Sequence, residues 1–496
     1  MKPRAQPVEM DDVQGLARFA YKRHTEAAFV LLRVKHRDAG RAWLAGAPIA
    51  SARTIEPPPE TALQIALTSA GMRALGVAED ILGGFSPEFT TGMGGDANLA
   101  RRLGDVGAND PDLWQWGTGL RVPHVLLMLY ALPGKLAAWQ SAIEAQCADG
   151  FEALACLSSS DMGGVEPFGF VDGISQPQPD WERQRPVQDE SRLTYTNLSC
   201  LGEFLLGYPN EYGGYTDRPL LDAQRDTLGL LPRAEDAPDQ ADVGRNGSYL
   251  VMRQLQQDVH GFWKYVDHQS AGNGGLRDQL AAAMVGRALS GEPLIGLSAD
   301  APPGDLNAFS YGNDPRGVRC PLGAHVRRAN PRNADLPPGS TGLLSRLVRM
   351  LGFNADARQR DLVASARFHR LLRRGREYGE RIPIAQALGG QSNGADPGLH
   401  FICLNANIAR QFEFVQAAWV NSLKFDGLTC ENDPLIGQRA PAPDGTCPSS
   451  RFSIQQPEGA DRLLTGLPQF VTVLGGGYFF LPGIRALRYL ATEGSA

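Results

Sequence analysis

The sequence predicts an α+β fold of two related halves, each with an antiparallel β-sheet and helices on one face. Three observations support this prediction. The chain has 496 residues, which is longer than one hydrophobic core usually serves. Short apolar runs of strand length alternate with helix-like segments in its first third. A similar order of elements returns later, although the sequence identity between the halves is too weak to prove a duplication.

The elements of the first half follow from its apolar residues. Four apolar runs have the length of strands, namely residues 29–34, 63–68, 122–129 and 151–157. Residues 134–146, rich in Ala and Leu, predict a helix before the fourth strand. The order strand, helix, strand, loop, strand, helix, strand is typical of an antiparallel sheet with helices on one face.

The later elements repeat this order. Strands are predicted at residues 249–255, 368–372 and 399–404, and a helix at residues 259–266. A further helix begins near Ile408, because its apolar residues fall on one helical face: Ile408, Phe412, Val415 and Trp419. We therefore expect an N-terminal half over residues 1–165 and a C-terminal half over residues 245–496. Residues 166–244 form a polar, Pro-rich connection, and residues 333–360 are expected to be a surface insertion.

Composition and charge exclude several classes of protein. The chain is 43% hydrophobic and 21% charged with a net charge of −6, which provides no basic surface for nucleic acid or for an anionic membrane. Residues 1–19 lack the apolar core of a secretion signal, and Gly and Pro interrupt the apolar stretch 470–484, which predicts buried core. The 7 cysteines are scattered without a CxxC pair, so we expect reduced thiols in the cytoplasm. The sequence is compatible with a homo-oligomer.

Residues 169–177, GFVDGISQP, are the most informative segment. Asp172 is bracketed by glycines in a tight turn with apolar neighbours, where the backbone can approach a flat ligand closely. The alternative is an ordinary turn in which Asp172 caps its own backbone.

A second segment, residues 319–332, reads RCPLGAHVRRANPR. The imidazole of His325 is suited to bind haem iron, and nearby guanidinium groups can pair with haem propionates. A structural, hydrogen-bonded histidine is the alternative for His325. Cys320 is a rival axial ligand, but the Phe- and Gly-rich sequence that usually surrounds a haem thiolate is missing.

The third segment, residues 368–379, reads FHRLLRRGREYG. The permanent charge of Arg373 would stabilise the negative charge that develops as the O–O bond of a peroxide breaks. A solvated basic turn is the alternative.

Together the three segments resemble the signature motifs of the dye-decolorising peroxidase family, a GxxDG turn, an AH(I/V)R segment and an (I/L)LRRG strand end. The resemblance covers most of the chain from Phe168 onward and is closest to the longer members. It extends to residues 201–209, 258–263, 405–419 and 431–437.

The resemblance implies two ferredoxin-like halves of the dimeric α+β barrel type, with one haem b per chain held mainly by the C-terminal half. His325 would be the proximal iron ligand, and Asp172 and Arg373 the distal proton-transferring and charge-stabilising residues. Other residues would contact the haem or its propionates, namely Gly169, Phe170, Val171, Gly173, Ile174, Arg327 and Arg332. Since no CxxCH occurs, the haem would be non-covalent.

The implied function is the reduction of hydrogen peroxide with one-electron oxidation of dyes, phenolics or other small organic donors. The alternative is a protein for haem storage, delivery or iron release with incidental peroxidase activity. A carrier needs neither Asp172 nor Arg373, so the presence of both favours an enzyme.

Two positions depart from the family pattern. Glu377 stands where members often have Pro. The proximal histidine of the family usually hydrogen-bonds a carboxylate, and one position where relatives can carry Asp is Asn407 here. Glu431 or Asp433 can take that role, which sets the basicity of the imidazole.

Overall fold

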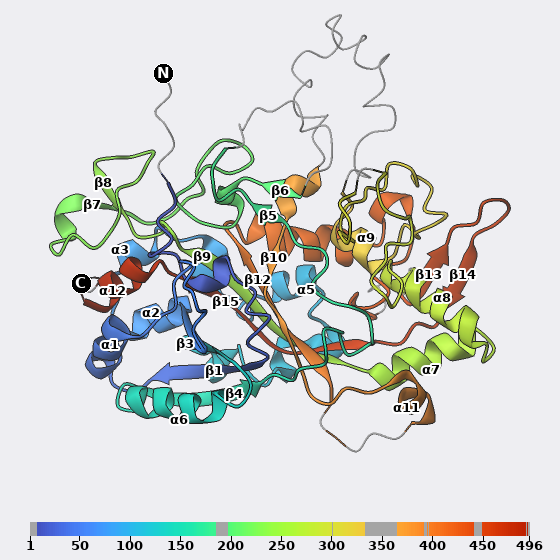
Figure 1. Cartoon of the computed structure of the whole chain (residues 1–496), viewed down its shortest axis with the longest axis horizontal. Helices are drawn as coiled ribbons and strands as arrows, with labels where there is room; N and C mark the ends of the chain where they lie inside the picture. The colour runs from blue at the N-terminus through green and yellow to red at the C-terminus, as the bar shows by residue number, and fades with distance from the viewer. Residues whose placement is uncertain are drawn as a thin grey trace, which may run out of the picture.

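A computed structural model of the chain describes residues 7–184, 197–299, 301–332, 365–390, 394, 396–440, 449–492 and 494. Its central feature is an antiparallel sheet of 9 strands, in the order β10-β12-β9-β15-β2-β3-β1-β4, with β11 also paired to β12. Figure 1 shows this sheet running through the molecule, with helices gathered around both of its ends.

The first half has the strand order β4-β1-β3-β2, which is the ferredoxin-like arrangement. Its strands are β1 (Glu26–Val34), β2 (Thr61–Leu67), β3 (Val125–Ala131) and β4 (Phe151–Ser158). Helix α1 (Arg37–Gly46) follows β1, and α6 (Leu136–Cys147) follows β3. Shorter helices lie between β2 and β3, namely α2 (Ser69–Ala74), α3 (Glu79–Leu82), α4 (Pro87–Thr91) and α5 (Ala97–Leu103). The predicted order of elements is therefore confirmed.

The second half repeats the same order, since its first strand lies between its third and its fourth. Its strands are β9 (Ser248–Gln257), β10 (Leu372–Arg373), β11 (Arg376–Tyr378), β12 (Gly398–Asn405) and β15 (Val471–Leu481). Its helices are α7 (Val259–Gln269), α8 (Gly274–Val285), α9 (His325–Ala329) and α11 (Ile384–Gly389). Two π-helical turns, Ala409–Glu413 and Val415–Val420, follow β12. A small hairpin of β13 (Arg451–Ile454) and β14 (Arg462–Thr465) precedes β15.

The two half-sheets join edge to edge, which the sequence did not predict. Phe480 of β15 pairs with Leu67 of β2. The C-terminal helix α12 (Ile484–Thr492) crosses back and packs on α1 (Figure 1), where Arg41 donates hydrogen bonds to the carbonyls of Ala491 and Thr492. The boundaries at residues 165 and 245 stay a proposal.

The segment between the halves carries short strands and loops. Its strands form two pairs, β5 (Gln178–Pro179) with β6 (Leu198–Ser199) and β7 (Leu220–Asp222) with β8 (Gln240–Asp242). The insertion predicted at residues 333–360 lies outside the described residues.

Several local predictions need correction. Residues 368–372 are not one strand, because Ser365–His369 forms a 3-10 turn and β10 begins only at Leu372. The carbonyl of Arg370 accepts a hydrogen bond from the Gln411 side chain and does not join a strand ladder.

The cysteines also differ from the prediction. Reduced thiols were expected throughout, but Cys430 is disulfide-bonded. No helix in the described part of the chain is long and apolar enough to cross a membrane.

Candidate active site

A cavity in the C-terminal half brings together residues of all three motifs. One wall consists of side chains from β9, β12 and β15, and another of residues from α9 and the second π-helical turn. Residues 103–105 and Asn109 from the N-terminal half also line the cavity. Much of the lining is apolar, including Phe170, Leu255, Val326, Phe401, Val415, Trp419, Leu435 and Ile436. Such a surface suits a large, flat, mostly apolar ligand.

His325 is the first residue of α9, and a buried carboxylate fixes its ring. The Nδ1 atom of His325 lies 2.9 Å from Oδ2 of Asp433, a residue with no exposed side-chain surface. The other oxygen of Asp433 accepts hydrogen bonds from the backbone N–H groups of Leu435 (2.9 Å) and Ile436 (3.0 Å). Glu431 makes a different contact, since its Oε2 accepts a 2.7 Å hydrogen bond from the hydroxyl of Ser453. Of the two carboxylates left open by the sequence, Asp433 is the partner of His325.

The pair also shifts the pKa of both partners. Burial works against the charged imidazolium, but the charge of Asp433 and its hydrogen bond outweigh this effect and raise the pKa of His325. Burial likewise works to raise the pKa of Asp433, yet His325 and two backbone N–H groups hold it below its ordinary value. The result is an electron-rich imidazole whose Nε2 atom remains available to the cavity.

The GxxDG segment forms a small hairpin at the cavity. Val165 pairs with Val171, and the backbone N–H of Asp172 donates to the carbonyl of Gly164 at 3.1 Å. The glycines that bracket Asp172 have φ angles of 95° and 73°, which favour glycine over residues with a side chain. Residues 170–177 of this segment line the cavity, and they include five site residues named from the sequence: Phe170, Val171, Asp172, Gly173 and Ile174. Gly169 is not part of the lining and serves the turn.

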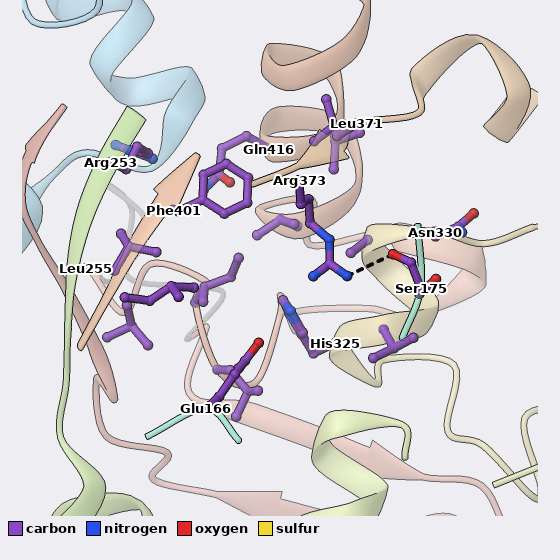
Figure 2. Close-up of a pocket in the computed structure, with 18 of the residues that line it drawn as sticks. Glu166, Ser175, Arg253, Leu255, His325, Asn330, Leu371, Arg373, Phe401 and Gln416 are labelled. Carbon is purple, nitrogen blue, oxygen red and sulfur yellow. Dashed lines mark hydrogen bonds between the residues drawn. The ribbon is translucent and has the colours of Figure 1, made fainter. Parts of the chain in front are cut away.

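Arg373 lies in β10 and is tied to the GxxDG segment. Its Nη2 atom donates a 2.8 Å hydrogen bond to the carbonyl of Ser175, and its backbone N–H donates to Oε1 of Gln176 at 3.0 Å. Figure 2 shows the guanidinium of Arg373 and the ring of His325 pointing toward one another from opposite sides of the cavity. A charged donor and a potential metal ligand therefore face the same space.

Glu166 is a further carboxylate at the cavity, and the sequence reasoning missed it. Its backbone N–H donates to Phe170 at 2.8 Å, so strand alternation puts Glu166 and Asp172 on the same side of the hairpin. Burial raises the pKa of Glu166 to about 8; the charge of Asp172 acts in the same direction and that of Arg373 opposes it. The sequence does carry a signal for Glu166. It is an acidic residue on the other side of the turn Pro167–Gly169 from Asp172, and the even spacing between the two predicts that they share one face of the hairpin.

Arg327 and Arg332 are not among the residues that line the cavity, so their contact with haem propionates stays a prediction. Arg327 donates to the carbonyls of Asp314 (3.1 Å) and Cys320 (3.0 Å). Arg332 donates to the carbonyls of Asn307 (3.0 Å) and Phe309 (2.6 Å). Both guanidinium groups are buried and hold neighbouring loops together.

Arg287 is a further cation, which the sequence reasoning did not name. It lines the cavity, is 5% exposed, and donates from Nη1 to the carbonyls of Gly291 (2.7 Å) and Leu306 (3.0 Å). Its Nη2 atom is buried without a hydrogen-bond partner among the described residues. Burial, followed by the charge of Arg332, lowers the pKa of Arg287 to about 10. A buried, unpaired guanidinium N–H at the cavity fits an anionic group such as a carboxylate of a bound cofactor.

Cys320 does not compete with His325 as a metal ligand. Its side chain is buried and does not line the cavity. Burial raises the pKa of the thiol to about 12, so it stays protonated at neutral pH. Because the thiolate is the form that binds metal, this geometry leaves the role to His325.

Comparisons with known proteins point in one direction, although no family model matches the chain. A multifunctional dye peroxidase of Amycolatopsis sp. is 31% identical over 449 residues, which span 86% of this chain and 82% of that protein. A dye-decolorizing peroxidase of Auricularia auricula-judae is 28% identical over 456 residues, 86% of this chain and 75% of that protein. The crystal structure of a fungal DyP-type peroxidase from Auricularia auricula-judae has a TM-score of 0.73 and 25% identity, covering 98% of this chain and 100% of that one. With its three motifs gathered at one cavity, the chain belongs to the dye-decolorising peroxidase family.

Proposed function

We propose that this member of the family uses His325, Asp172 and Arg373 to reduce hydrogen peroxide while oxidising dyes, phenolics or other small donors one electron at a time. The observation that carries the proposal is the cavity in which Arg373 faces a histidine with a buried carboxylate partner. A dye-decolorizing peroxidase of similar fold has been solved in complex with 2,6-dimethoxyphenol, which supports phenolic donors.

The residues of the cavity fit one non-covalent haem b. Nε2 of His325 would bind the iron, the apolar lining would contact the macrocycle, and Nη2 of Arg287 would receive a propionate. Bound there, the haem supplies the redox centre that passes electrons from the donors to the peroxide. Asp433 would keep the imidazole oriented and basic.

The protein's own residues would handle protons and charge. Asp172 takes a proton from one peroxide oxygen and returns it to the other, so that this oxygen leaves as water. Arg373 stabilises the negative charge on the departing oxygen as the O–O bond breaks. Two electrons from two donor molecules and two protons complete the conversion of one hydrogen peroxide to two waters.

One experiment separates an enzyme from a haem carrier. The protein is purified with adequate haem supply, and its haem absorption band is followed by stopped flow after hydrogen peroxide is added. A peroxidase shows a rapid change in that band, which a phenolic donor reverses. A haem band that responds only slowly would indicate a carrier, and absence of the band would contradict the haem site.

Cytoplasmic location and assembly into a homo-oligomer also belong to the proposal. The sequence feature behind the first is the scattered cysteines without a CxxC pair. The disulfide at Cys430 counts against it, since disulfides are uncommon in reducing compartments. Cell fractionation tests the location, and the native mass in solution tests the assembly.

A further inference from the structure

Arg439 folds back over the turn that carries Asp433, the partner of His325. Nη2 of Arg439 donates hydrogen bonds to the backbone carbonyls of Asp433 (2.9 Å) and Pro434 (2.7 Å). Its Nη1 atom donates to Oδ1 of Asn432 at 2.6 Å. One planar guanidinium therefore holds three consecutive residues, 432–434, which are here called the Asp433 turn.

Two further contacts attach the Asp433 turn to the walls of the cavity. Nε of Arg439 donates to the carbonyl of Pro468 at 3.3 Å, shortly before β15 begins at Val471. The backbone N–H of Asp433 donates to the carbonyl of Val420 at 2.9 Å, at the end of the second π-helical turn. Val471 and Val420 both line the cavity. The position of the turn relative to the cavity is therefore fixed from two sides.

Arg439 is charged at neutral pH and acts on the backbone of Asp433. Burial lowers the pKa of Arg439 to about 10, and the charge of Asp433 works in the opposite direction. Its hydrogen bonds to the carbonyls are therefore charge-assisted, which makes them stronger than those of a neutral donor. Among the described residues, the carboxylate of Asp433 is hydrogen-bonded by His325 and by two backbone N–H groups, not by Arg439. Arg439 therefore does not compete with His325 for the carboxylate.

The direction of the Asp433 carboxylate depends on the backbone that Arg439 holds. An aspartate side chain is short, so a shift of its backbone changes the 2.9 Å distance between Oδ2 of Asp433 and Nδ1 of His325. Hydrogen bonds weaken as their geometry departs from the preferred distance and angle. Since this hydrogen bond sets the basicity of the imidazole, a residue that holds the turn also controls that basicity.

We propose that Arg439 is a positioning residue for the Asp433–His325 pair and sets the reduction potential of a haem bound at His325. It acts through Asp433, since Arg439 is not among the residues that line the cavity. This inference rests on the proposed haem ligation by His325. It adds a determinant of the potential that lies outside the three motifs.

Two substitutions separate the hydrogen bonds of Arg439 from its charge. Arg439→Met removes the charge and every donor at similar length. Arg439→Lys keeps the charge but loses the planar fork that reaches several oxygens at once. Arg41→Met is the matched control, because Arg41 also donates to backbone carbonyls, those of Ala491 and Thr492, and is not among the cavity residues. Haem titration, thermal unfolding and spectroelectrochemistry are applied to all three variants and the parent.

Loosening the Asp433 turn should weaken the hydrogen bond to His325 and give a less basic imidazole. The reduction potential of Arg439→Met should therefore become more positive, and its haem affinity should fall by about tenfold, the lower end of the range for such partners. Arg439→Lys should shift the potential in the same direction by a smaller amount. Arg41→Met should keep the parent potential even where its thermal stability falls.

The sign of the shift distinguishes positioning from charge. Removal of a nearby cation, acting through charge alone, favours the ferric haem and makes the potential more negative. A negative shift in Arg439→Met, a parent-like potential, or an equal shift in Arg41→Met would each overturn the proposal. If Arg439→Met does not fold, Arg439→Lys provides the same test, and a parent-like potential in it would overturn the proposal.

A double variant tests whether Arg439 acts through Asp433. In the Asp433→Asn background the carboxylate is already lost, so Arg439→Met should add little further shift in potential. A shift as large as that in the parent background would show an independent effect and refute the positioning role. A parent protein that binds no haem, or an unchanged haem spectrum in His325→Ala, would instead refute the ligation on which the inference rests. The two failures are therefore distinguishable.

Discussion

Asp433 lies 108 residues beyond His325 in the chain, yet its Oδ2 is 2.9 Å from the imidazole Nδ1. The backbone N–H groups of Leu435 and Ile436 hold the second oxygen of Asp433, so the carboxylate cannot rotate away without losing them. This arrangement fixes both the direction and the basicity of the imidazole.

Asp433→Asn should weaken haem binding by about 10–100-fold, the range typical for loss of such a partner. An amide gives a less basic imidazole, so the haem reduction potential should become more positive. Haem titration and spectroelectrochemistry measure the two effects. Glu431→Gln is the matched control, since Glu431 bonds Ser453, and it should leave the potential unchanged. Equal shifts in both variants would contradict the pairing.

His325→Ala should yield protein that is largely haem-free or has an altered haem spectrum, because it removes the proposed iron ligand. His400→Ala should retain haem, since Nε2 of His400 is 3.0 Å from the Ser158 carbonyl and the residue does not line the cavity. Absorption spectra of both purified variants provide the comparison. An unchanged parent spectrum in His325→Ala would remove His325 from its assigned role.

Asp172→Asn and Arg373→Leu should both slow the reaction with peroxide while haem content stays near normal. Loss of a proton shuttle costs about 10²–10⁴ in rate. Loss of a preorganised charge stabiliser costs roughly 10²–10³. Stopped-flow absorbance measures both. Asp161→Asn is the control for the first, because Asp161 is exposed and accepts a hydrogen bond from the backbone N–H of Gly163. Parent-like peroxide kinetics in both cavity variants would favour the haem carrier.

Glu166 should introduce a pH dependence on the alkaline side. Its pKa is raised to about 8, so it is neutral below that pH and adds a negative charge beside Asp172 above it. That charge opposes the stabilisation by Arg373, and the peroxide reaction should slow as pH rises through about 8. Glu166→Gln stays neutral and should lose this alkaline decline. Rate profiles across pH 6–10 for parent and variant test the assignment, and an identical decline in both would contradict it.

Much of the fold could be predicted from local pattern. The apolar runs at residues 29–34 and 249–255 fall within β1 and β9, because a strand between neighbours on both sides needs a continuous apolar sequence. The third strand was predicted from Val122 but begins at Val125, since Pro123 cannot donate to a ladder. The strand predicted at residues 368–372 was wrong, because the carbonyl of Arg370 accepts a hydrogen bond from the side chain of the distant Gln411 and does not pair with a neighbouring strand.

The sequence by itself determined the order of elements and singled out His325, Asp172 and Arg373, which line one cavity, because strand periodicity and motifs depend on neighbours along the chain. Only the tertiary structure decided which carboxylate pairs with His325 and that Arg287, in place of Arg327 or Arg332, lines the cavity. Long side chains such as arginine reach several loops, and the carbonyls that capture them depend on how distant segments pack. The same reason explains the ion pair of Arg253 and Asp105, which forms because β9 and the loop after α5 meet across the joined sheets.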